Sequence, residues 1–348
     1  MTPRRLVPGG AVPTSLVGAV LARDLSVAGE RWAKGRRLSA RDLDTLRDGG
    51  AVPEAGLTVL VLGRDDVHED DAAMRLATAV CGGGLECRGP AQSRVDLVAA
   101  SPGVLHVEVA ALERVNRIDP VEVFTAFDGS VVEPGDLVAS VKIAPHFVAE
   151  STLARAESVA RGERPLVRVA PFERRRVAVV VKEAIHAIAR QRFEDSVRTK
   201  VESLGSEIAS IDYVADAPDA VEAAMAALVR GRSAVDIVLT AGGGSTDPAD
   251  AFFVALERLG GRVVRRGVPA HPGSMLWLGR AGATTVLGLP TCGAYSKATA
   301  ADLLLPRLLA GDAPTAATIA KLGHGGLLTR DQRFRFPRYA RDLEAPDG

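Results

Sequence analysis

Apolar positions in the second half of the chain recur in two alternating patterns. Continuous apolar runs predict buried strands at residues 176–181, 207–214, 235–240, 262–268 and 284–289. Apolar residues spaced three or four positions apart predict helices at residues 194–204, 218–229, 248–259 and 297–309. Strands that alternate with helices in this way predict an α/β domain with a three-layer, parallel or mixed sheet over residues 174–313.

The pattern in the first half is shorter and less regular. A helix is expected between Ser39, which can cap it, and Gly49, which can end it. Further elements are expected as a strand at 57–62, a helix at 67–80, and short strands within 93–110 and 131–143. We therefore expect a β/helix segment at 1–56, an α+β middle domain at 57–173 and, after the α/β domain, an extended tail at 314–348.

The acidic run Glu69, Asp70 and Asp71 opens the helix expected at 67–80. It could form an acidic site. A solvated helix start is the favoured interpretation, because the helix dipole stabilises acidic residues in the first turn.

Composition excludes some classes of function. The chain has 348 residues, with 43 Lys+Arg and 43 Asp+Glu, so its formal net charge is zero. A general nucleic-acid binder needs a basic face that displaces counterions, so the balanced charge argues against that class. Aromatic residues make up 4% of the chain, which leaves little material for base-stacking platforms. A compact anionic ligand is still compatible with zero net charge, because a pocket needs only a few local donors.

Cysteine and histidine positions do not predict a metal centre. Cys81 and Cys87 are close in sequence and Cys292 is remote, which matches no zinc-ligand spacing and indicates free thiols. The N-terminal 22 residues are broken by Pro and Gly and do not fit a secretory signal. No run approaches the roughly 20 apolar residues of a membrane span. We therefore expect a cytoplasmic protein.

Residues 240–250 form one candidate binding loop, because they leave a predicted strand and enter a predicted helix. Ligands of open parallel sheets bind beyond the carboxyl ends of the strands. Glycines let the backbone approach a ligand, and a helix N-terminus presents free N–H groups to an anion. The candidate contacts in this loop are Gly242, Gly243, Gly244, Ser245, Thr246 and Asp247. The glycine spacing fits neither a Walker loop nor a dinucleotide fingerprint.

The same loop has a purely structural interpretation. Asp247 followed by Pro248 is a good pair for the N-cap and first position of a helix. Asp250 in the first turn then suits the helix dipole. Spacing alone does not choose between a ligand loop and a well-capped helix start.

Two further segments carry chemistry-bearing side chains. Residues 288–297 also run from a strand to a helix, where Ser296 can cap the helix and Lys297 can reach an anion. Cys292 is either a small buried apolar side chain or a thiol that faces the pocket. Residues 267–276 are predicted to be a turn, in which His271 either contacts a ligand or is an ordinary loop residue.

In this order, these segments resemble the molybdopterin-binding domain shared by molybdopterin molybdotransferases, molybdopterin adenylyltransferases and competence-damage-type proteins. The resemblance rests on Gly242-Gly243, Ser245, Asp250, Leu259-Gly260-Gly261, Pro272-Gly273 and Gly288-Leu289-Pro290. It covers residues 174–313. The rest of the chain is more loosely similar to stand-alone bacterial members with a long N-terminal extension.

The resemblance implies that molybdopterin is the ligand. Its phosphate is expected over the loop 242–246 and the helix start at Ser296 and Lys297. The resemblance implies that Asp250 is the catalytic residue, binding a divalent metal such as Mg²⁺ or orienting the phosphate. Further contacts implied by the resemblance are Pro272, Gly273, Pro290, Thr291 and Cys292, the last toward the dithiolene or the metal.

Four departures from the family pattern bear on its chemistry, and one of them is that Gly-Leu-Pro-Gly-Asn-Pro becomes Gly288-Leu-Pro-Thr-Cys-Gly293. An Asp is replaced by Pro248, and an Arg-Pro-Gly-Lys stretch becomes His271-Pro-Gly-Ser274. The Gly-Asp-Glu that follows the first strand becomes Lys182-Glu-Ala. Loss of these charged groups argues against molybdate insertion by the usual route, whereas backbone N–H groups can still bind a pterin phosphate.

The leading hypothesis is a molybdopterin-binding protein of molybdenum cofactor biosynthesis, which transfers a group at the pterin phosphate by adenylylation or molybdate insertion. Mg²⁺ would stabilise charge in such a reaction. The alternative is a non-catalytic carrier or regulator that delivers the cofactor to a molybdoenzyme. Hydrolysis of a nucleotide-derived substrate, as in the competence-damage-type relatives, is a third hypothesis. The resemblance also implies a homo-oligomer, with other cofactor-biosynthesis proteins as partners.

Overall fold

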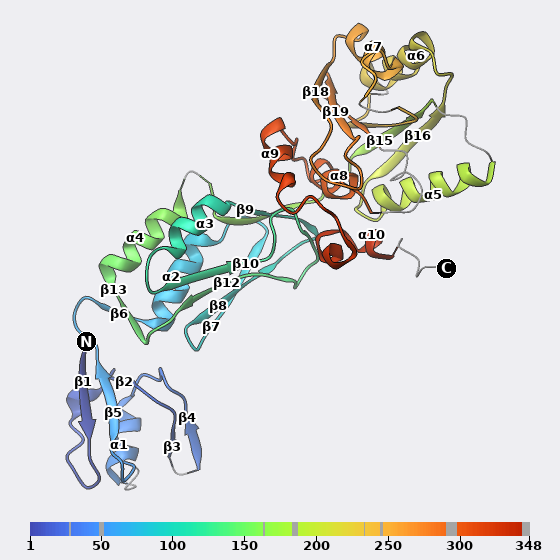
Figure 1. Ribbon diagram of the computed structural model, residues 1–348. Coiled ribbons are helices and arrows are strands. Elements are labelled where there is room, and N and C mark those ends of the chain that lie inside the picture. The colour runs from blue at the N-terminus through green and yellow to red at the C-terminus, as the bar shows by residue number, and fades with distance from the viewer. Residues whose placement is uncertain are drawn as a thin grey trace. The chain divides into compact units, whose positions relative to one another are not determined.

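The computed structural model describes residues 1–27, 29–48, 52–162, 164–182, 187–232, 234–243, 246–289 and 298–342. It divides into two compact units (Figure 1). Unit 1 comprises residues 1–101, 105–128 and 132–169, and unit 2 comprises residues 102–104, 129–131 and 170–348. The four-part division expected from the sequence stays a prediction.

The N-terminal part of unit 1 is a small β structure with one helix. Its strands are β1 (Thr2–Leu6), β2 (Val20–Leu21), β3 (Leu25–Val27), β4 (Glu30–Trp32) and β5 (Leu57–Val61), and its helix is α1 (Ala40–Asp48). Antiparallel strands in the order β1-β5-β2 form its sheet, beside the hairpin β3-β4. Ser39 starts α1 as expected, because its Oγ accepts from Asp42 N at 3.2 Å and Asp42 Oδ2 accepts from Ser39 N at 2.8 Å.

The remainder of unit 1 is built on an antiparallel sheet in the order β10-β12-β8-β7. Its strands and helices are β6 (Asp66–His68), α2 (Glu69–Val80), β7 (Leu85–Ala91), β8 (Arg94–Ala99), α3 (Val109–Asn116), β10 (Val121–Thr125), β12 (Leu137–Ile143), β13 (Phe147–Ala149) and α4 (Glu150–Arg161). Strands β9 (Gly103–Val107), β11 (Val131–Val132) and β14 (Val167–Pro171) form a further sheet in the order β11-β9-β14. Helix α2 packs on β8 and β12, and α4 packs on α2 (Figure 1).

The start of α2 is more buried than the sequence suggests. Glu69 is 5% exposed, and its Oε1 lies 3.2 Å from Nδ1 of His146. Asp71 pairs with Arg37. The interpretation of Glu69 as part of a solvated helix start is therefore wrong, because the neighbouring chain segments cover it.

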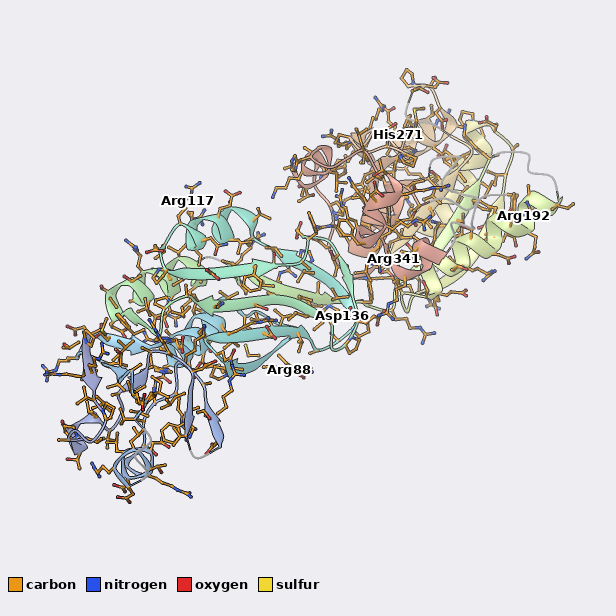
Figure 2. The ribbon with its side chains drawn as sticks, turned by 60° about the horizontal axis from the view of Figure 1, so that its bottom comes forward. Arg88, Arg117, Asp136, Arg192, His271 and Arg341 are labelled. Atoms are coloured by element: carbon orange, nitrogen blue, oxygen red, sulfur yellow. The ribbon has the colours of Figure 1, made fainter. Side chains whose placement is uncertain are left out.

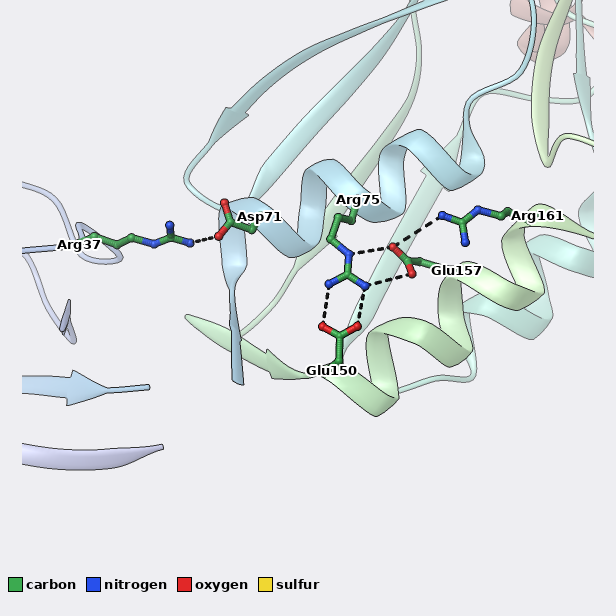
Figure 3. Close-up of polar contacts among 6 residues, drawn as sticks. All are labelled: Arg37, Asp71, Arg75, Glu150, Glu157 and Arg161. Atoms are coloured by element: carbon green, nitrogen blue, oxygen red, sulfur yellow. Dashed lines mark hydrogen bonds and ion pairs between the residues drawn. The ribbon is translucent and has the colours of Figure 1, made fainter. Parts of the chain in front are cut away.

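One arginine ties α2 to α4 (Figure 3). Arg75 of α2 binds both oxygens of Glu150 at 2.7 Å, and its Nε lies 3.0 Å from Glu157 Oε1. The Glu157 side chain is only 9% exposed. Arg75 is therefore its main cationic partner, since Arg161 lies 3.9 Å away and is 62% exposed.

Substitution of Arg75 by methionine is expected to lower the free energy of unfolding by about 1–3 kcal/mol, because the buried Glu157 carboxylate loses its hydrogen-bond donor. Urea unfolding followed by circular dichroism measures the loss. Arg161→Met is the matched control and should change stability by less than about 0.5 kcal/mol, as for an ordinary surface pair. Equal effects of the two substitutions would contradict this role for Arg75.

Unit 2 is a three-layer α/β structure, which confirms the predicted fold class. Its sheet has the order β16-β15-β17-β20-β19-β18. The strands are β15 (Arg176–Val181), β16 (Glu207–Tyr213), β17 (Ile237–Ala241), β18 (Arg262–Arg266), β19 (Trp277–Ala281) and β20 (Thr284–Gly288). The four strands β16, β15, β17 and β20 pair in parallel, and β18 and β19 join antiparallel. Strand β19 directly follows the segment expected to be a turn and was not predicted.

Helices cover both faces of this sheet because successive strand residues point to opposite sides. Val177 and Val179 pack with side chains of α5 (Ala187–Glu202) and α8 (Ala301–Leu309). Ala178 and Val180 pack on the other face with α6 (Pro218–Val229) and α7 (Ala251–Arg258). Helix α5 begins earlier than residue 194, where the sequence placed its start.

The C-terminal tail is not the extended arm that the sequence suggested. It contains α9 (Ala316–Ala320), two short 3-10 segments and α10 (Arg338–Asp342). Ile319, Phe336 and Tyr339 enter the same core as α5 and α8. Arg341, labelled in Figure 2, donates to the carbonyls of Phe336 and Phe334 at 2.9 Å. The tail folds onto unit 2 because its apolar side chains are buried in this core, whereas an extended arm would leave them exposed to solvent.

Tyr339 makes the stability of unit 2 sensitive to alkaline pH. Burial and the negative charge of Asp302 raise the pKa of its phenol well above the ordinary value of 10.0. In the unfolded chain the phenol ionises near pH 10, so the neutral ring favours the folded state fully below that pH. That contribution is lost as the pH rises further.

We expect the free energy of unfolding to fall between about pH 9 and 11 more steeply in the wild type than in Tyr339→Phe, since the unfolded phenol titrates in that range. Urea unfolding at several pH values measures both slopes. The pKa values of Lys182 and Tyr213 are also raised, by carboxylate partners for Lys182 and by burial for Tyr213, so only the difference between the two proteins reports on Tyr339. Parallel slopes would show that Tyr339 does not contribute.

Candidate functional site

Three loops meet at the carboxyl edge of the parallel strands in unit 2. Lys182 follows β15, Asp216 lies beyond β16, and Gly242 and Gly243 follow β17. Neighbouring parallel strands end on the same edge of a sheet, which is where open α/β sheets bind their ligands. This edge is therefore the candidate site.

Lys182 is the centre of this arrangement. Its side chain is 5% exposed, and its Nζ lies 2.7 Å from Asp216 Oδ1 and 3.0 Å from Asp250 Oδ2. Nζ also lies 5.5 Å from the ring centre of Phe252. Burial opposes the charge, but the two carboxylates outweigh it and hold the pKa of Lys182 above its ordinary value. The ammonium is therefore charged at neutral pH.

The two acidic partners differ in exposure. The Asp250 side chain is 8% exposed, whereas that of Asp216 is 60% exposed. Asp250 Oδ1 accepts from Phe252 N at 2.9 Å and so caps α7. Both Asp250 oxygens thus have partners inside the protein, whereas Asp216 is the partner of the ammonium that is in contact with solvent.

The helix start differs from the sequence expectation. Asp250, not Asp247, is the N-cap of α7, and Pro248 lies before the helix. Asp247 is exposed and accepts from Ala249 N at 2.8 Å, which makes a local turn. The tertiary contact with Lys182 favours the cap at Asp250, where the carboxylate also meets a buried cation.

The glycines at this edge allow close packing. Gly242 has φ +90°, a conformation that favours glycine. A Cβ on Gly243 would lie 2.8 Å from Asp250 Oδ2 and 3.1 Å from Lys182 Cε. Glycine at 243 therefore lets the backbone after β17 lie directly on the ion pair.

The remaining predicted contacts fall in three groups. Thr246 is exposed near Asp247. Pro272 and Gly273 contact the start of α8, because Ala300 N donates to Pro272 O at 3.0 Å and a Cβ on Gly273 would lie 2.8 Å from Ala300 N. The predicted contacts Gly244, Ser245, Pro290, Thr291, Cys292, Ser296 and Lys297 lie outside the described residues.

His271 lies in the loop between β18 and β19 (Figure 2). Its backbone N–H donates to Gly326 O at 2.7 Å, and its carbonyl accepts from Leu328 N at 2.8 Å. The backbone of this loop is thus joined to the C-terminal tail, which gives the segment a structural role.

Sequence reasoning identified Lys182 only as a departure from a pattern and did not select Asp216. Their positions just beyond predicted strands were the available indication, because carboxyl ends of parallel strands meet. The local sequence does not indicate that Lys182 contacts both Asp216 and Asp250, because these residues lie in three different loops.

A resident Mg²⁺ does not fit the contacts of Asp250. The ion requires carboxylate oxygens at about 2.0–2.1 Å. One Asp250 oxygen caps α7 and the other faces Lys182. Among the described residues, no group of three or more His, Cys, Asp or Glu side chains is placed to hold a metal ion. None of the described helices is long and apolar enough to cross a bilayer.

Comparisons with known proteins show what the domain around this edge is similar to. Residues 178–310 match the family model described as a probable molybdopterin binding domain. No curated protein matches the chain. The solved molybdopterin biosynthesis enzyme MoaB of Thermus thermophilus is 21% identical over 40% of this chain and 98% of its own, with a TM-score of 0.29.

Two further solved structures have similarly low sequence identities and TM-scores. The molybdopterin biosynthesis MoeA protein of Pyrococcus horikoshii is 16% identical over 70% of this chain and 79% of its own, with a TM-score of 0.31. A molybdenum cofactor biosynthesis protein B is 16% identical over 44% of this chain and 93% of its own, with a TM-score of 0.25. The family match covers less than half of the chain, and it shows that residues 178–310 are similar to the domain described as a probable molybdopterin binding domain.

Proposed function

We propose that unit 2 binds molybdopterin by its phosphate at the carboxyl edge of β15, β16 and β17. The observation that carries the proposal is the buried, charged Lys182 at this edge of a domain that matches the molybdopterin-binding family. Glycine at 242 and 243 leaves the backbone beside Lys182 uncovered by side chains, which would let a ligand approach it closely. Residues 290–297 would supply the remaining contacts, as the sequence predicts.

The proposed activity is group transfer at the pterin phosphate. In the adenylylation form, a phosphate oxygen of the pterin forms a bond to the α-phosphorus of ATP, and pyrophosphate leaves. In the molybdate form, the two thiol groups of the adenylylated pterin would bind molybdenum while one molybdate oxygen leaves with their protons as water, and a second water would cleave the phosphoanhydride bond so that AMP leaves. Asp250 acts as a positioning residue, because it holds Lys182 and caps α7.

Incubation of the full chain with molybdopterin, ATP, Mg²⁺ and molybdate tests the activity. Mass spectrometry should detect adenylylated pterin and pyrophosphate, or the molybdenum-loaded pterin. Native mass spectrometry of the protein purified from its host should detect a bound pterin. Absence of pterin binding under both conditions would refute the proposed function.

A non-catalytic carrier is the second candidate. The observation that favours it is that both oxygens of Asp250, the predicted catalytic residue, already have protein partners. A carrier would bind the pterin without turnover and release it to a molybdoenzyme. The same incubation separates the two functions, because the carrier binds but forms no pyrophosphate.

A further inference from the structure

The Lys182 cluster contains one fixed carboxylate and one that can be exchanged. Asp250 is buried and held by the helix cap, whereas Asp216 is 60% exposed. Water can hydrate Asp216 when it leaves the ammonium, so releasing it is far less costly than releasing Asp250. Lys182 itself is confined by Phe252 and by the backbone at Gly243.

We propose that Lys182 receives the anionic group of the ligand directly, and that the ligand displaces the Asp216 carboxylate from it. Asp216 is the exposed partner of a side chain that is itself only 5% exposed, so an anion that binds the ammonium from the solvent can take the place of this carboxylate. One oxyanion replaces another, so the balance of charge beside the buried ammonium changes little. Asp216 is then a built-in competitor of the ligand.

If the ligand anion replaces Asp216 at Lys182, no metal ion is needed to bind that anion. The ammonium lies within hydrogen-bond distance of both carboxylates, so a positive charge already occupies the place where they converge. Phosphate binding at Lys182 is therefore expected in the presence of EDTA. The inference rests on the proposed function only for the identity of the anion, a phosphate monoester of a pterin.

Binding of inorganic phosphate to the full chain, followed by ³¹P NMR titration in EDTA, tests the inference. Asp216→Asn removes the competing charge and should tighten binding about fivefold, the upper range for an exposed pair. Lys182→Met should abolish binding, and Lys182→Met combined with Asp216→Asn should not restore it. Lys182→Arg keeps the positive charge and should retain binding.

Asp219→Asn is the matched control. Asp219 lies three residues after Asp216, is 93% exposed and pairs with Arg258 instead. Its substitution should leave phosphate binding unchanged. If Lys182→Met does not fold, as judged by circular dichroism, the comparison of Asp216→Asn with Asp219→Asn still decides the question.

Three results would overturn the inference: unchanged or weaker binding in Asp216→Asn, undiminished binding in folded Lys182→Met, or binding that requires Mg²⁺. Failure of the proposed function has a different signature. In that case phosphate shows the expected pattern across the variants, but the protein retains no molybdopterin. If molybdopterin binds equally to the wild type and Lys182→Met, the inference fails and the proposed function stands.

Discussion

Substitution of Lys200 by methionine is expected to cost about 3–5 kcal/mol of the free energy of unfolding, as is usual when one partner of a buried ion pair is removed. Lys200 of α5 and Asp302 of α8 are 2% and 1% exposed, and Nζ lies 2.5 Å from Oδ1. The other Asp302 oxygen accepts from Thr299 N at 2.9 Å. Without Lys200, a charged carboxylate stays buried with one backbone donor.

Fluorescence of Trp277 during urea unfolding measures this loss in unit 2. A Trp32→Phe background removes the second tryptophan of the chain, which lies in unit 1. Combining Lys200→Met with Asp302→Asn should recover part of the stability, because the amide carries no charge. A loss below about 1 kcal/mol in the single variant would contradict the role of the pair, since that is within the effect of a surface ion pair.

Substitution of Asp250 by alanine is expected to lower the free energy of unfolding by about 2–4 kcal/mol, the sum of two losses. Loss of the N-cap accounts for about 1 kcal/mol. Loss of the buried partner of Lys182 accounts for about 1–3 kcal/mol. Because Lys182 then loses its fixed position, binding of the pterin phosphate should also weaken.

Asp250→Asn separates the two contributions. Asparagine caps helices about as well as aspartate, so this variant should keep the cap and lose only the charge. Urea unfolding should therefore place it between the wild type and Asp250→Ala. If Asp250→Ala had wild-type stability and wild-type pterin binding, neither the structural nor the functional role of Asp250 would stand.

Local pattern was enough to predict most of unit 2. Buried strands such as β15 and β17 are continuous apolar runs, and α6 has its predicted bounds because Pro218 opens it. Strand β19 was missed because its start follows a Pro-Gly turn and it lacks a long apolar run. The tail helices were missed because they are short and acquire their stability from the core that they enter.

The amino-acid order is sufficient for the order of most strands and helices in unit 2, the glycine-rich loop after β17 and the family resemblance, because each depends on residues near one another in the chain. It left the helix cap open, since Asp247 and Asp250 both satisfy the local rules. The choice of Asp250 and the meeting of Lys182 with Asp216 depend on three loops brought together by the parallel sheet. Contacts between such distant segments depend on strand order and burial, which no local pattern specifies.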